Sequence, residues 1–183
     1  QSENLRSYVA QHIHGMDIEY VDNPSYATTN NIYSLWLARN YLVRDDTILL
    51  ESDLIYEPGV IRELVEYGAP DVAVVAHYEQ WMEGTVTLLD AQDRIVEFVE
   101  KKNFAFDRAQ DYYKTVNIYK FSREFSQQHY LPFLNAYIEA YGPSEYYELV
   151  LKAIAHLAHS GLKAFKLTGQ KWYEIDDAQD LDI

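Results

Sequence analysis

The sequence contains no cysteine, which excludes disulfide bonds and thiolate-ligated metal sites. It has no apolar run long enough to cross a membrane. Neither end carries the charged-then-apolar pattern of a secretory signal. We therefore expect a cytoplasmic protein without a membrane span.

Basic residues are scarce, with 15 Lys and Arg against 29 Asp and Glu, so the formal net charge is −14. A surface that binds nucleic acid needs clustered Lys and Arg, so we expect no nucleic-acid partner. A nucleotide can still bind such a chain where a divalent cation bridges carboxylates and phosphates. Tyrosine is abundant, with 17 copies. Most tyrosines serve packing, but aromatic walls also hold bases or quaternary amines.

The 183 residues contain 48% hydrophobic and 24% charged residues, which is typical of one globular domain over residues 1–183. Helical and extended patterns alternate along the chain and predict an α/β fold. The expected helices cover residues 2–11, 30–42, 58–67, 122–141 and 144–159. The expected strands cover residues 17–21, 47–50, 71–76, 85–89, 94–99, 114–121, 163–167 and 171–175.

Two local arrangements follow from this order. The strands at 85–89 and 94–99 flank a four-residue turn and predict a hairpin. Residues 48–76 read as strand, helix, strand, which predicts a parallel unit with a right-handed crossover.

Carboxylates stand at the ends of two expected strands. Asp53 follows the apolar run 47–50, and strand alternation puts Glu51 on the same side. Asp176 and Asp177 follow the strand at 171–175. Mg²⁺ needs only one or two carboxylates besides water and phosphate oxygens, so Asp53 and Asp176 suffice if they meet in space. The alternative is that Asp53 caps the next helix or satisfies a turn.

A third candidate is the junction between strand and helix at residues 26–31, Tyr-Ala-Thr-Thr-Asn-Asn. Small and amide side chains can approach a ring closely and bond its polar edge. The same residue types also favour turns and helix caps, so the junction alone leaves both interpretations open.

Four collinear segments together resemble phosphocholine and 2-aminoethylphosphonate cytidylyltransferases. They are residues 23–35, 49–54, 114–121 and 172–177. The resemblance implies a Rossmann-like, GT-A-like nucleotidyltransferase fold with a mixed sheet flanked by helices. It also implies transfer of a cytidylyl group from CTP to a phosphorylated amino alcohol or a phosphonate.

The same resemblance implies roles for individual residues. It assigns catalysis and Mg²⁺ binding to Asp53 and Asp176, with Asp177 as the fallback. It places Thr29, Asn30 and Asn31 at the base and ribose of the nucleotide. Glu100 and Lys101 resemble a pair of residues on the acceptor side of related sugar-phosphate enzymes. Candidate aromatic contacts to the acceptor head group are Tyr119, Tyr146, Tyr147 and Trp81.

One motif of these enzymes has no counterpart. They begin with a glycine-rich loop, G-x-G-[ST]-R, and a following lysine that hold the triphosphate, whereas Gly15 stands alone here. We therefore expect a chain truncated at its N-terminus that is inactive in isolation. Its uncovered apolar edge favours a homo-oligomer.

Three other functions remain open. A sugar-1-phosphate nucleotidylyltransferase and a nucleotide-sugar glycosyltransferase share the arrangement of carboxylates at a strand end. A non-catalytic nucleotide-binding or scaffolding domain would also fit a chain without the phosphate-binding loop.

Overall fold

The structure is a computed structural model that describes residues 2–157, 160–175, 177–178 and 180. Its centre is a six-stranded mixed sheet in the order β5-β4-β6-β3-β7, with β1 also paired to β6. These strands are β1 Thr47–Leu50, β3 Val72–His77, β4 Val86–Leu89, β5 Ile95–Val99, β6 Tyr113–Phe121 and β7 Lys163–Leu167. A second, two-stranded antiparallel sheet joins β2 Leu54–Tyr56 to β8 Trp172–Glu174. The predicted α/β class and the hairpin β4–β5 are both present.

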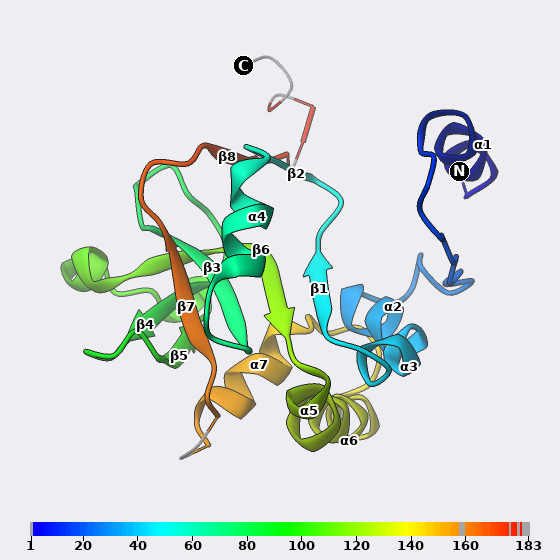
Figure 1. Cartoon of the computed structure of the whole chain (residues 1–183). Coiled ribbons are helices and arrows are strands. Elements are labelled where there is room, and N and C mark those ends of the chain that lie inside the picture. Colours follow the sequence, from blue (N-terminus) through cyan, green and yellow to red (C-terminus); the bar gives the residue numbers. More distant parts are fainter. Residues whose placement is uncertain (1, 158–159, 176, 179, 181–183) are drawn as a thin grey trace.

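Helices cover both faces of the large sheet (Figure 1). They are α1 Ser2–His12, α2 Asn31–Leu37, α3 Arg39–Leu42, α4 Gly59–Glu66, α5 Arg123–Phe125, α6 Leu131–Tyr141 and α7 Glu148–Ala155. Short 3-10 turns form η1 Lys101–Asn103 and η2 Phe106–Asp111, and a π-helical turn, η3 Ser126–Tyr130, joins α5 to α6. No helix among the described residues has the length and apolar character that a membrane crossing needs.

Strand β3 shows why its sequence is continuously apolar. Successive side chains of a strand point to opposite faces. Val72, Val74 and Ala76 pack in the core under α4, while Ala73 and Val75 pack in the core against α6 and α7. Both faces are therefore covered, and a continuous run of small apolar residues results.

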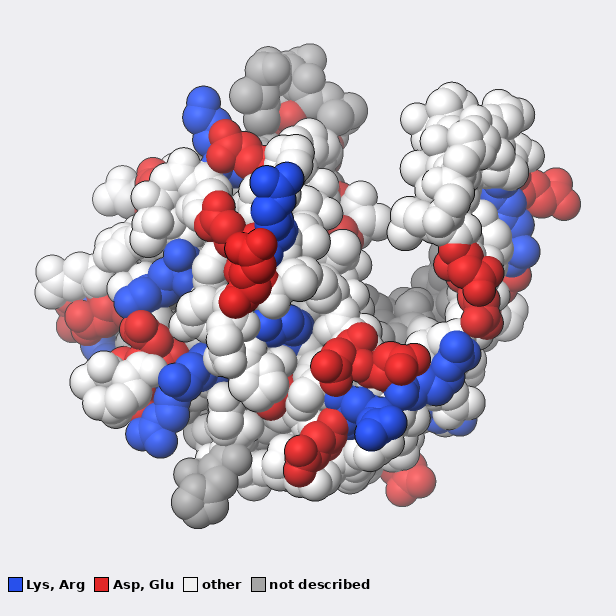
Figure 2. Space-filling view, in the orientation of Figure 1, with Lys and Arg blue, Asp and Glu red and all other residues white. Residues whose placement is uncertain are grey.

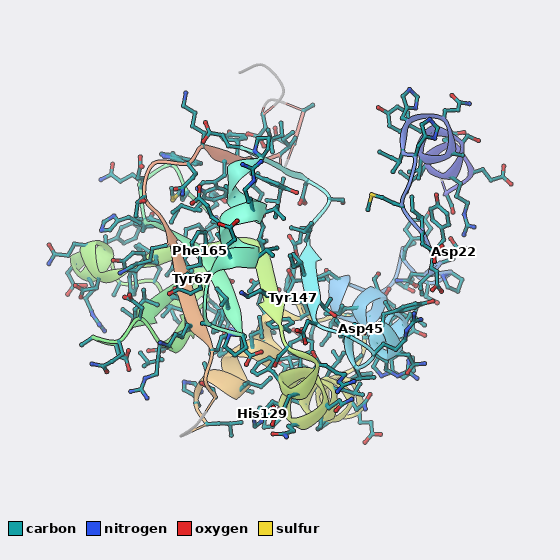
Figure 3. The ribbon with its side chains drawn as sticks, viewed as in Figure 1. Asp22, Asp45, Tyr67, His129, Tyr147 and Phe165 are labelled. Atoms are coloured by element: carbon teal, nitrogen blue, oxygen red, sulfur yellow. The ribbon has the colours of Figure 1, made fainter. Side chains whose placement is uncertain are left out.

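Two aromatic rings pack against each other at the edge of this core beside β7. Tyr67 follows α4, and its ring meets Phe165 of β7 edge-on at 5.2 Å between centroids (Figure 3). The Tyr67 hydroxyl also donates to the carbonyl of Ala164 at 3.4 Å. The turn after α4 is thereby fixed to the neighbouring strand.

The N-terminal arm, residues 2–22, stands apart from this core (Figures 1 and 2). Helix α1 has no buried residue. Polar contacts fold the arm onto itself, since Arg6 pairs with Asp22 at 2.6 Å and lies over the ring of Tyr20. Glu19 links the arm to α3 by accepting a hydrogen bond from the Tyr41 hydroxyl at 2.5 Å.

One sequence prediction is wrong at this level. Residues 17–21 form no strand, and no strand among the described residues pairs with them. Strands β1 and β3 are parallel to each other with α4 between them in the chain, as predicted, but they are not neighbours, because β6 lies between them and is antiparallel to both. The apolar run of β1 is also only half-buried, and Leu50 is 41% exposed.

We expect truncation of Leu151 on α7 to Ala to lower the free energy of unfolding by about 2–5 kcal/mol. The side chain is fully buried in the core, so the substitution removes contacts and leaves a cavity. Leu5→Ala on α1 is the matched control, because Leu5 is 58% exposed and its loss should cost under about 0.5 kcal/mol. Urea titrations measure both values, and equal losses would contradict the separation of the arm from the core.

Candidate functional site

Strand β6 organises the site. One of its edges pairs with β3, and the other pairs with β4 near Lys114 and with β1 from Ile118 onward. Between these two partners Asn117 adopts a positive φ of 58°, a conformation that Asn tolerates better than most residues. The Asn117 side chain is nearly buried and donates to Glu174 of β8 at 2.7 Å.

Three carboxylates converge beside this point. Glu51 and Asp53 lie between β1 and β2, and Glu174 ends β8. The pairing of β2 with β8 brings these ends together, and the Ile175 amide donates to the Asp53 carbonyl at 2.8 Å. One oxygen from each of Glu51, Asp53 and Glu174 lies within 4.8 Å of the others.

The three carboxylates, here called the acidic triad, differ in their surroundings. Burial raises the pKa of Glu51, and the nearby charge of Asp53 adds to that effect. Glu174 receives hydrogen bonds from Asn117 and, at 3.2 Å, from the ammonium of Lys114. Asp53 Oδ1 is buried and has no hydrogen-bond partner among the described residues. A buried carboxylate oxygen without a partner is costly, and a cation would satisfy it.

A cleft of about 670 Å³ opens over the triad. It is lined by Asn31, Glu51, Asp53, Glu83, Gly84, Thr85, Glu100, Lys101, Lys102, Lys114, Asn117, Glu145, Tyr146, Glu148, Leu149 and Glu174. Acidic side chains outnumber basic ones in this set, so the cleft favours a ligand that carries or brings positive charge.

Glu148 begins α7 and turns toward the cleft. One of its oxygens, Oε2, is buried and has no hydrogen-bond partner among the described residues. Burial raises the pKa of Glu148 to about 7, and the charge of Glu51 adds to the rise. The carboxyl group is therefore balanced between its neutral and charged forms near neutral pH.

The structure describes only one of the two residues that the sequence predicts as metal ligands. Asp53 lies in the triad, whereas Asp176 lies outside the described residues. Asp177 is exposed, and its amide donates to Asp180 Oδ2 at 3.0 Å. The roles of all three in catalysis or metal binding stay predictions.

Of the three residues predicted to contact the nucleotide, one lies in the cleft and two do not. Asn31 lines the cleft, where its amide donates to Glu51 at 3.3 Å and accepts from the Tyr147 amide at 3.0 Å. Asn30 accepts from the Asn31 amide and begins α2. Thr29 donates to the Ser25 carbonyl at 3.0 Å. Asn31 therefore joins the site, and Thr29 and Asn30 support the turn before it.

Of the residues predicted to bind the acceptor, some line the cleft and others are buried. Lys101 and Tyr146 line the cleft, and Lys101 pairs with Glu83 at 2.7 Å. Tyr119 is fully buried in the core, so its ring contacts only protein groups in this arrangement. Its side chain follows the inward alternation of β6, which the sequence alone could not assign to one face or the other.

Two further aromatic candidates lie at different depths. Tyr147 is nearly buried beneath the cleft, and it is labelled in Figure 3. Trp81 is half-exposed and stacks on Tyr173 at 5.7 Å between ring centroids. Trp81 lines a smaller adjoining hollow of about 330 Å³, which shares Lys114 and Glu174 with the cleft.

Sequence reasoning missed Glu174, Lys114 and Glu148. Glu174 stands within the motif 172–177 that directed attention to Asp176. Its placement depends on the register in which Glu174 faces Leu54 across the β2–β8 pair. Such a register is set by tertiary pairing and is not visible in the sequence of either strand.

Comparison with solved structures identifies the fold. A CTP:phosphocholine cytidylyltransferase from Streptococcus pneumoniae superposes with a TM-score of 0.76 at 16% identity, over 99% of this chain and 72% of that one. An inositol-1-phosphate CTP transferase from T. maritima gives 0.69 at 18% identity, over 97% and 67%. The chain has the nucleotidyltransferase fold. The fold predicted from the four sequence segments is thereby confirmed.

The nucleotidyltransferase resemblance also extends to sequence. The chain is 31% identical over 182 residues to the CMP-5'-(3-aminopropyl)phosphonate synthase of Streptomyces rubellomurinus. The match covers 97% of this chain and 28% of that protein, so the chain spans less than a third of the relative's length. No protein-family model matches the sequence. The resemblance to cytidylyltransferases is confirmed by this relative.

Glu148→Gln tests the electrostatics of the cleft. Because the pKa of Glu148 is raised from 4.5 to about 7, the folded protein binds its proton more tightly than the unfolded chain does. Its contribution to stability is therefore present below pH 4.5 and is lost as the pH rises toward 7. We expect Glu148→Gln to remove this part of the pH dependence and to raise the free energy of unfolding at pH 8 by about 2 kcal/mol.

Urea titrations from pH 4.5 to 8 measure this effect. Glu139→Gln is the control, since Glu139 is exposed on α6 and should change stability by under about 0.5 kcal/mol at every pH. A pH profile that Glu148→Gln leaves unaltered would show that this carboxyl group is not perturbed.

Proposed function

We propose that the protein is a CTP-dependent cytidylyltransferase that joins CMP to a phosphate or phosphonate acceptor and releases pyrophosphate. The observation that carries the proposal is the acidic triad, with the unpartnered Asp53 Oδ1 at the floor of the cleft. The fold supports it, as does the similarity to a CMP-aminopropylphosphonate synthase.

The triad fits Mg²⁺ in chemistry. Magnesium takes oxygen ligands, and Asp53 and Glu51 offer carboxylate oxygens close together. Both oxygens of Glu174 accept hydrogen bonds, one from Asn117 and one from Lys114. Glu174 would therefore contribute less to metal binding than Asp53 and Glu51. We propose Asp53 as the principal ligand, with Asp176 as the second, as the sequence predicts. Bound there, the ion would supply charge neutralisation for the phosphates.

The chain's own residues position the reactants. In the proposed reaction an oxygen of the acceptor forms a bond to the α-phosphorus of CTP. The bond from that phosphorus to the bridging oxygen then breaks, and pyrophosphate leaves with its electron pair. A phosphate or phosphonate oxygen is already ionised at neutral pH, so the reaction needs positioning more than it needs a base. Asn31 would orient the nucleotide near Glu51, to which it is hydrogen-bonded.

The acceptor is proposed to carry a cationic end, as phosphocholine and 2-aminoethylphosphonate do. Glu145, Glu148 and Tyr146 line the cleft together and suit an ammonium group. Each contact between a cation and an aromatic face contributes about 0.5–2 kcal/mol, depending on exposure. A sugar phosphate would offer hydroxyl groups instead, and this fold also serves an inositol-1-phosphate transferase in T. maritima.

Asp53→Asn in the full-length natural protein should lower kcat/KM by at least about a hundredfold while leaving Tm within about 2 °C. The substitution keeps the shape of the side chain and removes the charge that would hold the cation. Pyrophosphate release is measured with CTP, Mg²⁺ and 2-aminoethylphosphonate, phosphocholine or glucose-1-phosphate at equal concentration. Asp107→Asn in η2, outside the cleft, is the matched control and should retain full activity.

The possible outcomes separate the parts of the proposal. Full activity of Asp53→Asn would exclude its role as a metal ligand. A preference for glucose-1-phosphate would overturn the cationic acceptor and leave nucleotidyl transfer in place. A large loss of Tm would favour the capping role of Asp53.

A further inference from the structure

Lys114 is an unusual residue for a cleft wall. Its side chain is only 3% exposed, whereas the neighbouring cleft lysines Lys101 and Lys102 are 70% and 73% exposed. Among the described residues it is the one Lys or Arg that is buried. Burial of an ammonium group costs several kcal/mol unless partners offset it. The environment of Lys114 must therefore supply those partners.

The protein supplies two of them. The ammonium donates to the Thr115 carbonyl at 2.7 Å and to Glu174 Oε2 at 3.2 Å. An ammonium group has three N–H donors, so one remains beyond these two hydrogen bonds. The ring of Trp172 lies nearby, with its centroid 5.9 Å from the ammonium, but no third hydrogen-bond acceptor stands among the described residues. Lys114 lines both the cleft and the adjoining hollow.

Gly84 keeps the approach to this ammonium open. A Cβ atom at Gly84 would lie 3.4 Å from both Nζ and Cε of Lys114, and Gly84 has a positive φ of 93°. Any other residue would be strained there and would narrow the space beside the ammonium. Gly84 lines the same cleft.

Along β6, Lys114 lies apart from the part of the cleft where the nucleotide is predicted to bind. Lys114 faces Val86 of β4, whereas the Asn117 carbonyl accepts from the amide of Glu51, the partner of Asn31. Three residues of a strand span about 10 Å. Lys114 is therefore nearer to the Gly84 side of the cleft, and Glu174 connects it to the acidic triad.

We propose that Lys114 binds the doubly charged phosphate or phosphonate group of the acceptor and so selects a dianion. The inference rests on the proposed function and names a specificity residue for it. The acidic groups Glu145 and Glu148 would take the cationic end, so a zwitterionic acceptor would have only one favourable orientation. That orientation would put the attacking oxygen beside the triad.

Binding measurements on the full-length natural protein test this inference separately from turnover. Isothermal titration compares 2-aminoethylphosphonate with 2-aminoethanesulfonate, which has the same shape and one negative charge fewer. The wild-type protein should bind the phosphonate at least tenfold more tightly. In Lys114→Met the preference should fall below threefold, while CTP affinity changes by less than threefold.

Lys102→Met is the matched control, because it removes an exposed lysine from the same cleft. It should keep the preference for the phosphonate. The inference is overturned if Lys114→Met keeps that preference, if Lys102→Met abolishes it, or if the wild-type protein shows none. A loss of CTP affinity alone would assign Lys114 to the nucleotide and would overturn the acceptor role. Turnover that persists in the wild-type protein would leave the proposed function standing in each case.

A second measurement needs no folded Met variant. The ammonium signal of a buried lysine can be followed by ¹H–¹⁵N NMR and assigned with Lys114→Arg. It should shift on addition of 2-aminoethylphosphonate and stay unchanged with ethylamine, which lacks the anionic end. An unchanged signal at saturating phosphonate would overturn the inference.

Discussion

The carboxylate of Glu174 connects the two sheets of the molecule. One oxygen accepts from Asn117 and the other from Lys114, and both donors belong to β6, whereas Glu174 belongs to β8. Backbone pairing of β8 with β2 then brings Asp53 beside Glu174. The positive φ of Asn117 and the burial of Lys114 both serve this contact. Together with the hydrogen bond from the Glu51 amide to the Asn117 carbonyl, it holds the strand ends that make the site against β6.

The charge distribution explains how so acidic a chain could bind anionic substrates. On the face shown in Figure 2, Lys and Arg lie among Asp and Glu, with no extended basic patch. Within the cleft, burial raises the pKa of Glu51 and Glu148, and repulsion from neighbouring carboxylates adds to the rise. In the proposed function a bound cation would relieve that repulsion, so cation binding and anion binding would support each other there.

Similarity to known proteins and cleft geometry bear on different parts of the function. The nucleotidyltransferase fold is shared by relatives whose acceptors differ, a choline phosphate in one and an inositol phosphate in another. A shared fold therefore does not choose the acceptor. The side chains around the cleft do, because an ammonium group, a hydroxyl group and a dianion need different partners.

The sequence by itself determined the α/β class, most strands and helices, and the closeness of Asp53 to Glu51 after a strand, because periodicity and strand alternation are local properties. It did not determine that β6 separates β1 from β3, or that residues 17–21 lack strand partners. Nor did it place Tyr119 in the core and bring Glu174, Lys114 and Glu148 to the cleft. Strand order, register and burial arise from contacts between distant segments, so only the tertiary structure decided them.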